Sequence, residues 1–189
     1  MSRSRRVGAY TAHEDARTAA CSTIALVVAW NQPIYPFYVH WIVGGDAWSA
    51  CWTFLSTPFF VAVPWLATRD SRAGRALLPA AGIANMIVSA KAFGPASGVA
   101  WFLIPCVLVA LLAFRRGERG YVAPLLVLAA SAFLVQPHLG APLGTFSAAD
   151  YARFARMNLY SAIGLSFVVL WSLGRAWLRD QNRSARVTA

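Results

Sequence analysis

The chain has 189 residues, of which 58% are hydrophobic and only 13% are charged, and its formal net charge is +10. About a quarter of the residues of a soluble domain are usually charged, so this composition excludes an ordinary soluble protein and favours an integral membrane protein. The charges lie in short runs between apolar stretches of about 20 residues, the length that crosses a bilayer. The basic excess therefore indicates membrane topology, and we expect no nucleic-acid partner.

The apolar stretches predict an all-α, polytopic membrane protein in which one domain, residues 1–189, forms a bundle of six transmembrane helices. Of the 17 Lys and Arg residues, only Lys91, Arg153 and Arg156 fall on one side of these spans, and all the others fall on the opposite side. By the positive-inside rule the arginine-rich side, with both termini, is cytoplasmic. The predicted spans are about 18–44, 47–67, 76–93, 97–114, 121–137 and 157–177.

Two capping-box patterns predict where helices begin. Thr11 is followed three residues later by Glu14, which predicts that the first helix begins before the membrane. Ser147 is followed in the same way by Asp150, which predicts that the sixth helix begins about two turns outside the bilayer.

The first span contains an unusual polar stretch, AWNQPIYPFYVHW, at 29–41. Its two prolines lack an N–H donor and free two backbone carbonyls near the middle of the membrane. The amides of Asn31 and Gln32 would bond to these carbonyls or to a neighbouring helix, where Asn85 and Ser89 lie at a similar depth. The stretch predicts a kink, which either holds the bundle together or shapes a cavity or hinge.

Two histidines, His40 and His138, lie at the outer ends of the first and fifth spans, at about the same depth. Imidazole is a common metal ligand and an axial ligand of haem iron, so one hypothesis is a b-type haem held between these two residues. The alternative is that both imidazoles simply lie in water at the membrane surface. Zinc is less favoured because no third ligand is obvious beyond Asp46. The same side carries residues that would pair with haem propionates or border the porphyrin: Lys91, Arg153, Arg156 and Trp41.

The sequence contains no pattern that predicts catalysis. It has no nucleophile elbow, no HExxH and no phosphate-binding loop, so we expect a protein that is not itself an enzyme. It also has no carboxylate at mid-membrane and no internal repeat with two interrupted helices, which weakens a transporter hypothesis.

Two adjoining stretches resemble the hexahelical membrane domain of bacterial class III adenylyl cyclases. The first is FFVAVPWLATRDSRAGRALLPAAGIAN, at 59–85, and the second is FGPASGVAWFLIPCVLVALLAF, at 93–114, followed by RRGERG. The resemblance covers about 45–180. It implies a sensory or regulatory module of a bacterial inner membrane, a homodimer, and a sixth helix that passes a signal to a fused cyclase domain or to a separate cytoplasmic signalling protein.

The sequence departs from this family after the sixth span. RAWLRDQNRSARVTA is its last stretch, where the family continues into an output domain. We expect either a receptor module cut from a longer protein or a stand-alone homologue. The leading hypothesis is a non-enzymatic sensor, which receives its signal within the bundle or at its outer mouth. The alternatives are a haem-binding redox or electron-transfer protein, which an absorbance spectrum would distinguish, and a small transporter or complex subunit.

Overall fold

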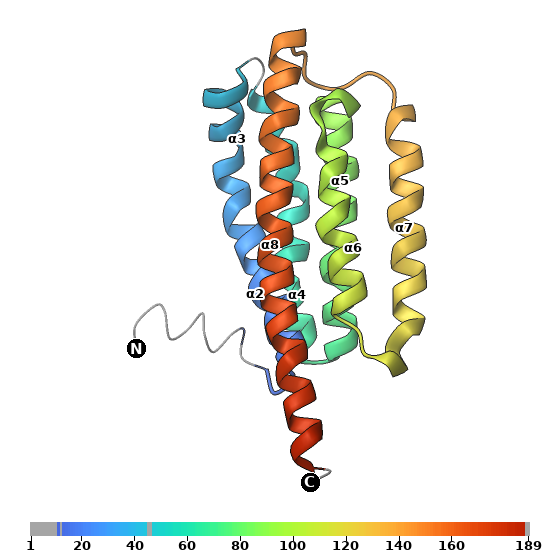
Figure 1. Cartoon of the computed structure of the whole chain (residues 1–189). Helices are drawn as coiled ribbons and strands as arrows, with labels where there is room; N and C mark the ends of the chain where they lie inside the picture. Colours follow the sequence, from blue (N-terminus) through green and yellow to red (C-terminus); the bar gives the residue numbers. More distant parts are fainter. Residues whose placement is uncertain (1–10, 12, 45–46, 188–189) are drawn as a thin grey trace.

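The computed structural model describes residues 11, 13–44 and 47–187, and every regular element among them is a helix. Helical segments run up and down the molecule in turn and form one elongated bundle (Figure 1). The expected all-α fold is therefore confirmed. The elements, in chain order, are α2 (Ala16–Asn31), η1 (Gln32–Ile34), α3 (Tyr35–Tyr38), η2 (Val39–Val43), η3 (Ala47–Ser56), α4 (Thr57–Ala67), α5 (Ser71–Phe93), η4 (Pro95–Ser97), η5 (Val99–Phe102), α6 (Leu103–Leu112), η6 (Arg116–Tyr121), α7 (Val122–Val135), η7 (Gln136–His138) and α8 (Ala148–Val187).

Four helices in the described part of the chain are long and apolar enough to cross a membrane: Trp48–Ala67, Ser71–Phe93, Arg116–His138 and Ala148–Gln181. They correspond to the second, third, fifth and sixth predicted spans. The fourth predicted span is the apolar but shorter helix Val99–Leu112. The first predicted span is the helical segment 16–43, which is not among the four. The polar side chains of Asn31 and Gln32 near its middle lower its mean hydropathy.

The two ends of the bundle carry different charged groups. We call the end that holds Arg17 and Arg115 the arginine-rich end, and the end that holds His40 and His138 the histidine end. The start of α2 and the C-terminal part of α8 meet at the arginine-rich end (Figure 1), where Nε of Arg17 donates to Oδ2 of Asp180 at 3.1 Å. The described chain therefore begins and ends on the same side of the bundle.

The capping box predicted at the start of the sixth span is confirmed, whereas the long helix of the first span is capped by a different residue from the one expected. The hydroxyl of Ser147 donates to Oδ2 of Asp150 at 2.7 Å and accepts the Asp150 N–H at 3.2 Å, which is the capping box expected at the start of α8. The first long helix, α2, begins instead at Ala16 and is capped by Asp15 rather than by Thr11. An ionised carboxylate directly before the first helical residue is a strong acceptor for the free N–H groups of the first turn.

The polar stretch of the first segment is a break in α-helical geometry whose amide bonds to two other helices. The chain passes through the 3₁₀ turn η1, the short helix α3 and the π-helical turn η2. Nε2 of Gln32 donates to the carbonyl of Thr53 at 3.1 Å and to Oδ1 of Asn85 at 3.4 Å, and Oε1 of Gln32 accepts the hydroxyl of Thr57. The predicted bond between this stretch and Asn85 is confirmed.

The polar group formed by Gln32, Thr53, Thr57 and Asn85 lies between two apolar parts of the core. On the side of the arginine-rich end, residues such as Ile24 and Phe60 are buried together. On the side of the histidine end, a second group is centred on Phe93 and Phe154, both of which are fully buried. Buried amides that find partners on other helices hold a bundle together in a lipid environment, where apolar contact alone has no preference for protein over lipid.

Candidate functional site

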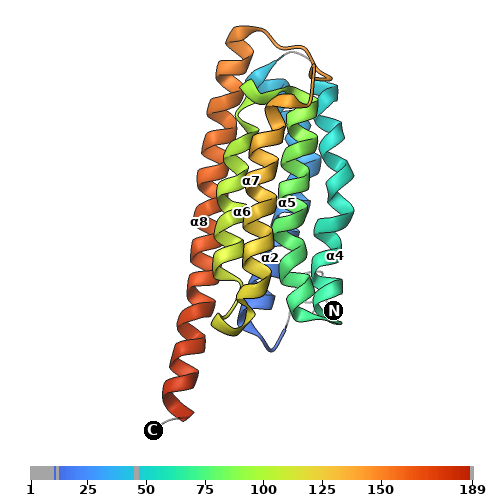
Figure 2. The same cartoon turned by 90° about the vertical axis from the view of Figure 1, so that its right-hand side faces the viewer.

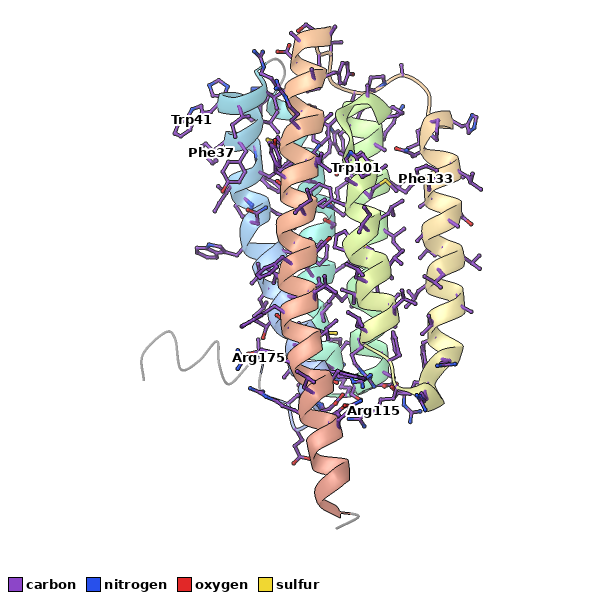
Figure 3. The ribbon with its side chains drawn as sticks, viewed as in Figure 1. Phe37, Trp41, Trp101, Arg115, Phe133 and Arg175 are labelled. Atoms are coloured by element: carbon purple, nitrogen blue, oxygen red, sulfur yellow. The ribbon has the colours of Figure 1, made fainter. Side chains whose placement is uncertain are left out.

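The two histidines lie at the same end of the bundle but on different flanks. His40 is exposed on the π-helical turn η2, and His138 is exposed on η7 after α7. The α3–η2 segment and α7 lie on opposite flanks in Figure 1, and in Figure 2 α7 faces the viewer while the α2–α3 segment lies behind the bundle. In Figure 3, Trp41 lies on one flank of the bundle and Phe133 of α7 lies on the other.

Lys91 holds a loop at the histidine end. Its Nζ donates to the carbonyls of Leu139 at 3.1 Å and Ala141 at 2.8 Å. Two backbone bonds join the same loop to the end of α5, from Leu143 N–H to the Lys91 carbonyl at 3.0 Å and from Gly144 N–H to the Ala92 carbonyl at 2.9 Å. The ammonium group therefore fastens the connection between α7 and α8 over the end of α5.

The two arginines at this end have different surroundings. Nε of Arg153 donates to the carbonyl of Val43 at 3.1 Å, and its guanidinium also forms an ion pair with Asp150. Arg153 therefore joins α8 to the end of η2. Arg156 is exposed, and its Nε donates to the carbonyl of Ala152 within α8.

Aromatic side chains fill the space between the helices at the histidine end. The ring of Phe154 lies 4.8 Å from that of Phe93 and 5.3 Å from that of Phe146, measured between centroids. The hydroxyl of Tyr151 donates to the Phe93 carbonyl at 3.0 Å. These aromatic rings form part of the buried core at the histidine end.

The structure does not bring His40 and His138 together around one group. Trp41, which would border a porphyrin, is 81% exposed on the flank away from α7. Asp46 lies outside the described residues, and among those described no group of three or more His, Cys, Asp or Glu residues is placed to hold a metal ion. Haem ligation by these two histidines stays a prediction.

A cluster of ion pairs at the arginine-rich end joins helices that are far apart in the sequence. Its first half is centred on Arg75, whose side chain is only 3% exposed. The Arg75 guanidinium binds both carboxylate oxygens of Glu118 at 2.9 Å and donates to the Ala113 carbonyl at 2.6 Å. It thereby connects α5 to the end of α6 and to η6.

The second half of the cluster joins α2 to α8. Arg17 is buried, binds Asp180 at 3.1 Å and donates to the Phe114 carbonyl at 2.9 Å. Arg115 bridges Asp15 at 3.0 Å and Asp180 at 3.2 Å. We call these residues the ion-pair cluster: Asp15, Arg17, Arg75, Arg115, Glu118 and Asp180.

The buried arginines also satisfy the end of α6. The last carbonyls of a helix have no partner within it and carry partial negative charge. Here guanidinium groups reach the carbonyls of Leu112, Ala113 and Phe114. The ion-pair cluster therefore bonds α2, α5, the end of α6, η6 and α8 to one another at the arginine-rich end.

The Asp15 carboxylate makes the stability of this cluster depend on pH. Burial acts to raise its pKa, but the hydrogen bond from Thr18 and the charges of Arg75 and Arg115 outweigh burial and lower the pKa below the ordinary value of 3.8. A carboxylate with a lowered pKa stabilises the folded state above its unfolded pKa, and this contribution is lost as the pH falls through the folded value.

We predict that Asp15→Asn lowers the free energy of unfolding by about 1–2 kcal/mol at pH 7, because a charged hydrogen-bond acceptor is lost. The difference from wild type should shrink as the pH falls below about 4, where Asp15 itself becomes protonated. Chemical unfolding of the purified protein in detergent at several pH values measures both effects. A difference that stays constant down to pH 2 would contradict the assignment.

The sequence pattern predicted only that the arginines lie on the cytoplasmic side. It did not predict the ion-pair cluster. One signal was present. The whole chain has only seven acidic residues, and Asp15, Glu118 and Asp180 all adjoin arginines on the same predicted side. In a chain with so few carboxylates, three of them at the same depth indicate ion pairing between helix ends.

Comparisons of the chain with protein-family models, with curated proteins and with solved structures find no match. The resemblance to the membrane domain of adenylyl cyclases therefore stays a prediction. The candidate functional site is therefore the ion-pair cluster, in which Asp180 of α8 binds Arg17 and Arg115.

Proposed function

We propose that this chain is a non-enzymatic sensory or regulatory module with six spans in a bacterial inner membrane and both ends in the cytoplasm. The four membrane-length helices, the short apolar helix Val99–Leu112 and the broken helical segment 16–43 would supply the six passes. The arginine-rich end would face the cytoplasm, because Lys and Arg gather on the cytoplasmic side of membrane proteins.

The observation that carries this proposal is the way α8 is held along its length. At the histidine end, Arg153 and Tyr151 bond to the ends of η2 and α5. Deeper in the bundle, the buried amide of Asn158 accepts the Tyr35 hydroxyl at 2.9 Å and donates to the Ser97 carbonyl at 2.9 Å.

At the opposite end, Asp180 bonds to Arg17 and Arg115, and α8 then continues beyond the other helices (Figure 1). A helix with polar contacts at three depths and a projecting end is suited to carry a displacement from the histidine end to a cytoplasmic output. The signal would be received within the bundle or at the histidine end, where α8 bonds to η2 and α5.

The output would be a cyclase domain that continues the chain or a separate signalling protein, as the resemblance implies. Such outputs are dimeric, and one flank of α8 supports a homodimer. Ser161 and Gly164 are exposed, and a side chain added at Gly164 would meet no atom within 4 Å. Small exposed residues allow the close approach of a helix from a second copy.

A fusion tests the proposal. With the catalytic domain of a class III adenylyl cyclase attached after residue 189, we expect Asp180→Asn to change cyclic AMP production at least about threefold. The lost charged bonds, at about 1–3 kcal/mol, would shift the equilibrium position of α8. Cyclic AMP is measured in cells that lack their own cyclase and is normalised to the amount of fusion protein.

The matched control is Arg116→Gln, since Arg116 is exposed at the same end and has no ion pair among the described residues. This variant should leave cyclic AMP production unchanged. If the Asp180→Asn fusion is as abundant as the wild-type fusion and produces the same amount of cyclic AMP, transmission through the end of α8 is refuted.

A further inference from the structure

A polar groove lies between the start of α2 and the C-terminal half of α8. Its volume is about 690 Å³. Small side chains on the two facing helices leave this space open, with Ala16, Ala19 and Ala20 on α2 and Ala176 on α8. The groove is on the face of α8 that carries Arg175, which Figure 3 shows at the arginine-rich end.

Two exposed arginines, Arg175 and Arg179, line the groove and form no ion pair with any described residue. One helical turn separates them, so both guanidinium groups reach the same face of α8. The carboxylates of the groove are Glu14, which is exposed, and Asp180, which already binds Arg17 and Arg115. The two arginines therefore offer positive charge that the ion-pair cluster does not neutralise.

The groove continues into an apolar part of α8. Trp171 lies one turn before Arg175, whose guanidinium carbon is 5.2 Å from the centre of a Trp171 ring. Trp171 stacks in turn on Phe167 at 6.3 Å, and both rings are more than half exposed. A tryptophan between arginines and an exposed apolar surface is typical of a helix at the headgroup level of a membrane.

We propose that this groove binds an anionic phospholipid of the leaflet at the arginine-rich end. Arg175 and Arg179 would bind the phosphate through charged hydrogen bonds. An acyl chain would lie along Phe167 and Trp171. Basic pockets between helices on the cytoplasmic side of a membrane recognise such headgroups, and the apolar surface beside the arginines favours a lipid over a free phosphate ion.

A bound lipid would lie beside Asp180, so it would regulate the same helix end that we assign to the output. The lipid proposal rests on the proposed membrane orientation of the arginine-rich end. It does not require the sensory function, because lipid binding and cyclic AMP production are measured separately.

The test uses the full chain purified in a neutral detergent and a short-chain phosphatidylglycerol as the probe. Native mass spectrometry counts bound lipid during the titration, with phosphatidylcholine and inorganic phosphate as parallel probes. We expect phosphatidylglycerol to bind with at least tenfold higher affinity than phosphatidylcholine. The double variant Arg175→Gln/Arg179→Gln should weaken this binding about 30-fold, since each surface arginine contributes about 1 kcal/mol toward an anionic lipid.

The matched control is Arg116→Gln/Arg119→Gln, which removes from the same end of the bundle two exposed arginines that form no ion pair with another described residue. It should bind phosphatidylglycerol like wild type. Circular dichroism shows whether each variant is folded, and the single variant Arg175→Gln serves if the double variant is not. Three results would overturn the proposal: equal affinity for both lipids, equal loss in both double variants, or binding of inorganic phosphate as tight as that of phosphatidylglycerol.

Discussion

Replacing Arg75 with alanine should lower the free energy of unfolding by about 3–5 kcal/mol, because removal of one partner leaves a charge without compensation in a buried site. The Arg75 side chain is 3% exposed, and its partner Glu118 is 12% exposed. The variant also removes the donor to the Ala113 carbonyl at the end of α6. Chemical unfolding of the purified protein in detergent, followed by circular dichroism, measures the loss.

Two further variants identify the cause of that loss. Arg116→Ala should change stability by no more than about 0.5 kcal/mol, because Arg116 is exposed and has no ion-pair partner in the described part of the chain. In Arg75→Ala/Glu118→Ala, part of the lost stability should return, because no carboxylate is left buried without a partner. If Arg75→Ala is as mild as Arg116→Ala, the cluster does not hold α5, α6 and η6 together.

Replacing Phe154 with alanine should lower the free energy of unfolding by about 3 kcal/mol, since it leaves a cavity among aromatic rings that cannot all move to fill it. Phe154 is completely buried and packs on Phe93 and Phe146. Even where lipid or detergent surrounds the protein, the lost contacts between tightly packed atoms are not replaced. Thermal unfolding of the variant in detergent tests this expectation.

Phe167→Ala is the matched control for Phe154→Ala. It removes the same side chain from the same helix, but Phe167 is 66% exposed. We expect its unfolding temperature to stay close to that of wild type. Equal effects of the two substitutions would mean that Phe154 does not pack in the interior of the histidine end.

These two predictions concern the two ends of α8. Phe154 packs α8 against the end of α5 and against the loop that precedes α8. Arg75 lies near Asp15, and Arg115 joins Asp15 to Asp180 of α8. If α8 carries a signal, Phe154→Ala in the cyclase fusion should uncouple the output from the histidine end. Asp180→Asn changes the output at the opposite end.

Local patterns and depth along the helices were predictable from the sequence. The capping box joins Ser147 and Asp150, which are three residues apart, so the hydrogen bonds between them follow from helix geometry alone. The bond between Gln32 and Asn85 links two helices, but both amides lie at mid-span, where a polar group must find a partner inside the bundle. The cap of α2 was not predicted, because Thr18 rather than Glu or Gln follows Asp15 three residues later and the capping-box pattern is incomplete there.

The lateral arrangement of the helices was not predictable in the same way. His40 and His138 were correctly placed at one end, but η2 and α7 lie on opposite flanks. Lys91 and Arg153 bind loop and helix-end carbonyls there. The position of a residue within an apolar span determines its depth in the membrane, but the neighbours of that span depend on packing among all the segments.

The sequence by itself determined the all-α class, the arginine-rich end, the kinked first segment and the start of α8, because each depends on composition, spacing or depth. Only the tertiary structure decided which arginines pair with the few carboxylates and which remain available. Arg75 and Arg17 are buried against Glu118 and Asp180, whereas Arg175 and Arg179 line an open groove. The physical reason is that ion pairing depends on distances of a few ångströms between side chains from different helices, which a pattern along one chain does not contain.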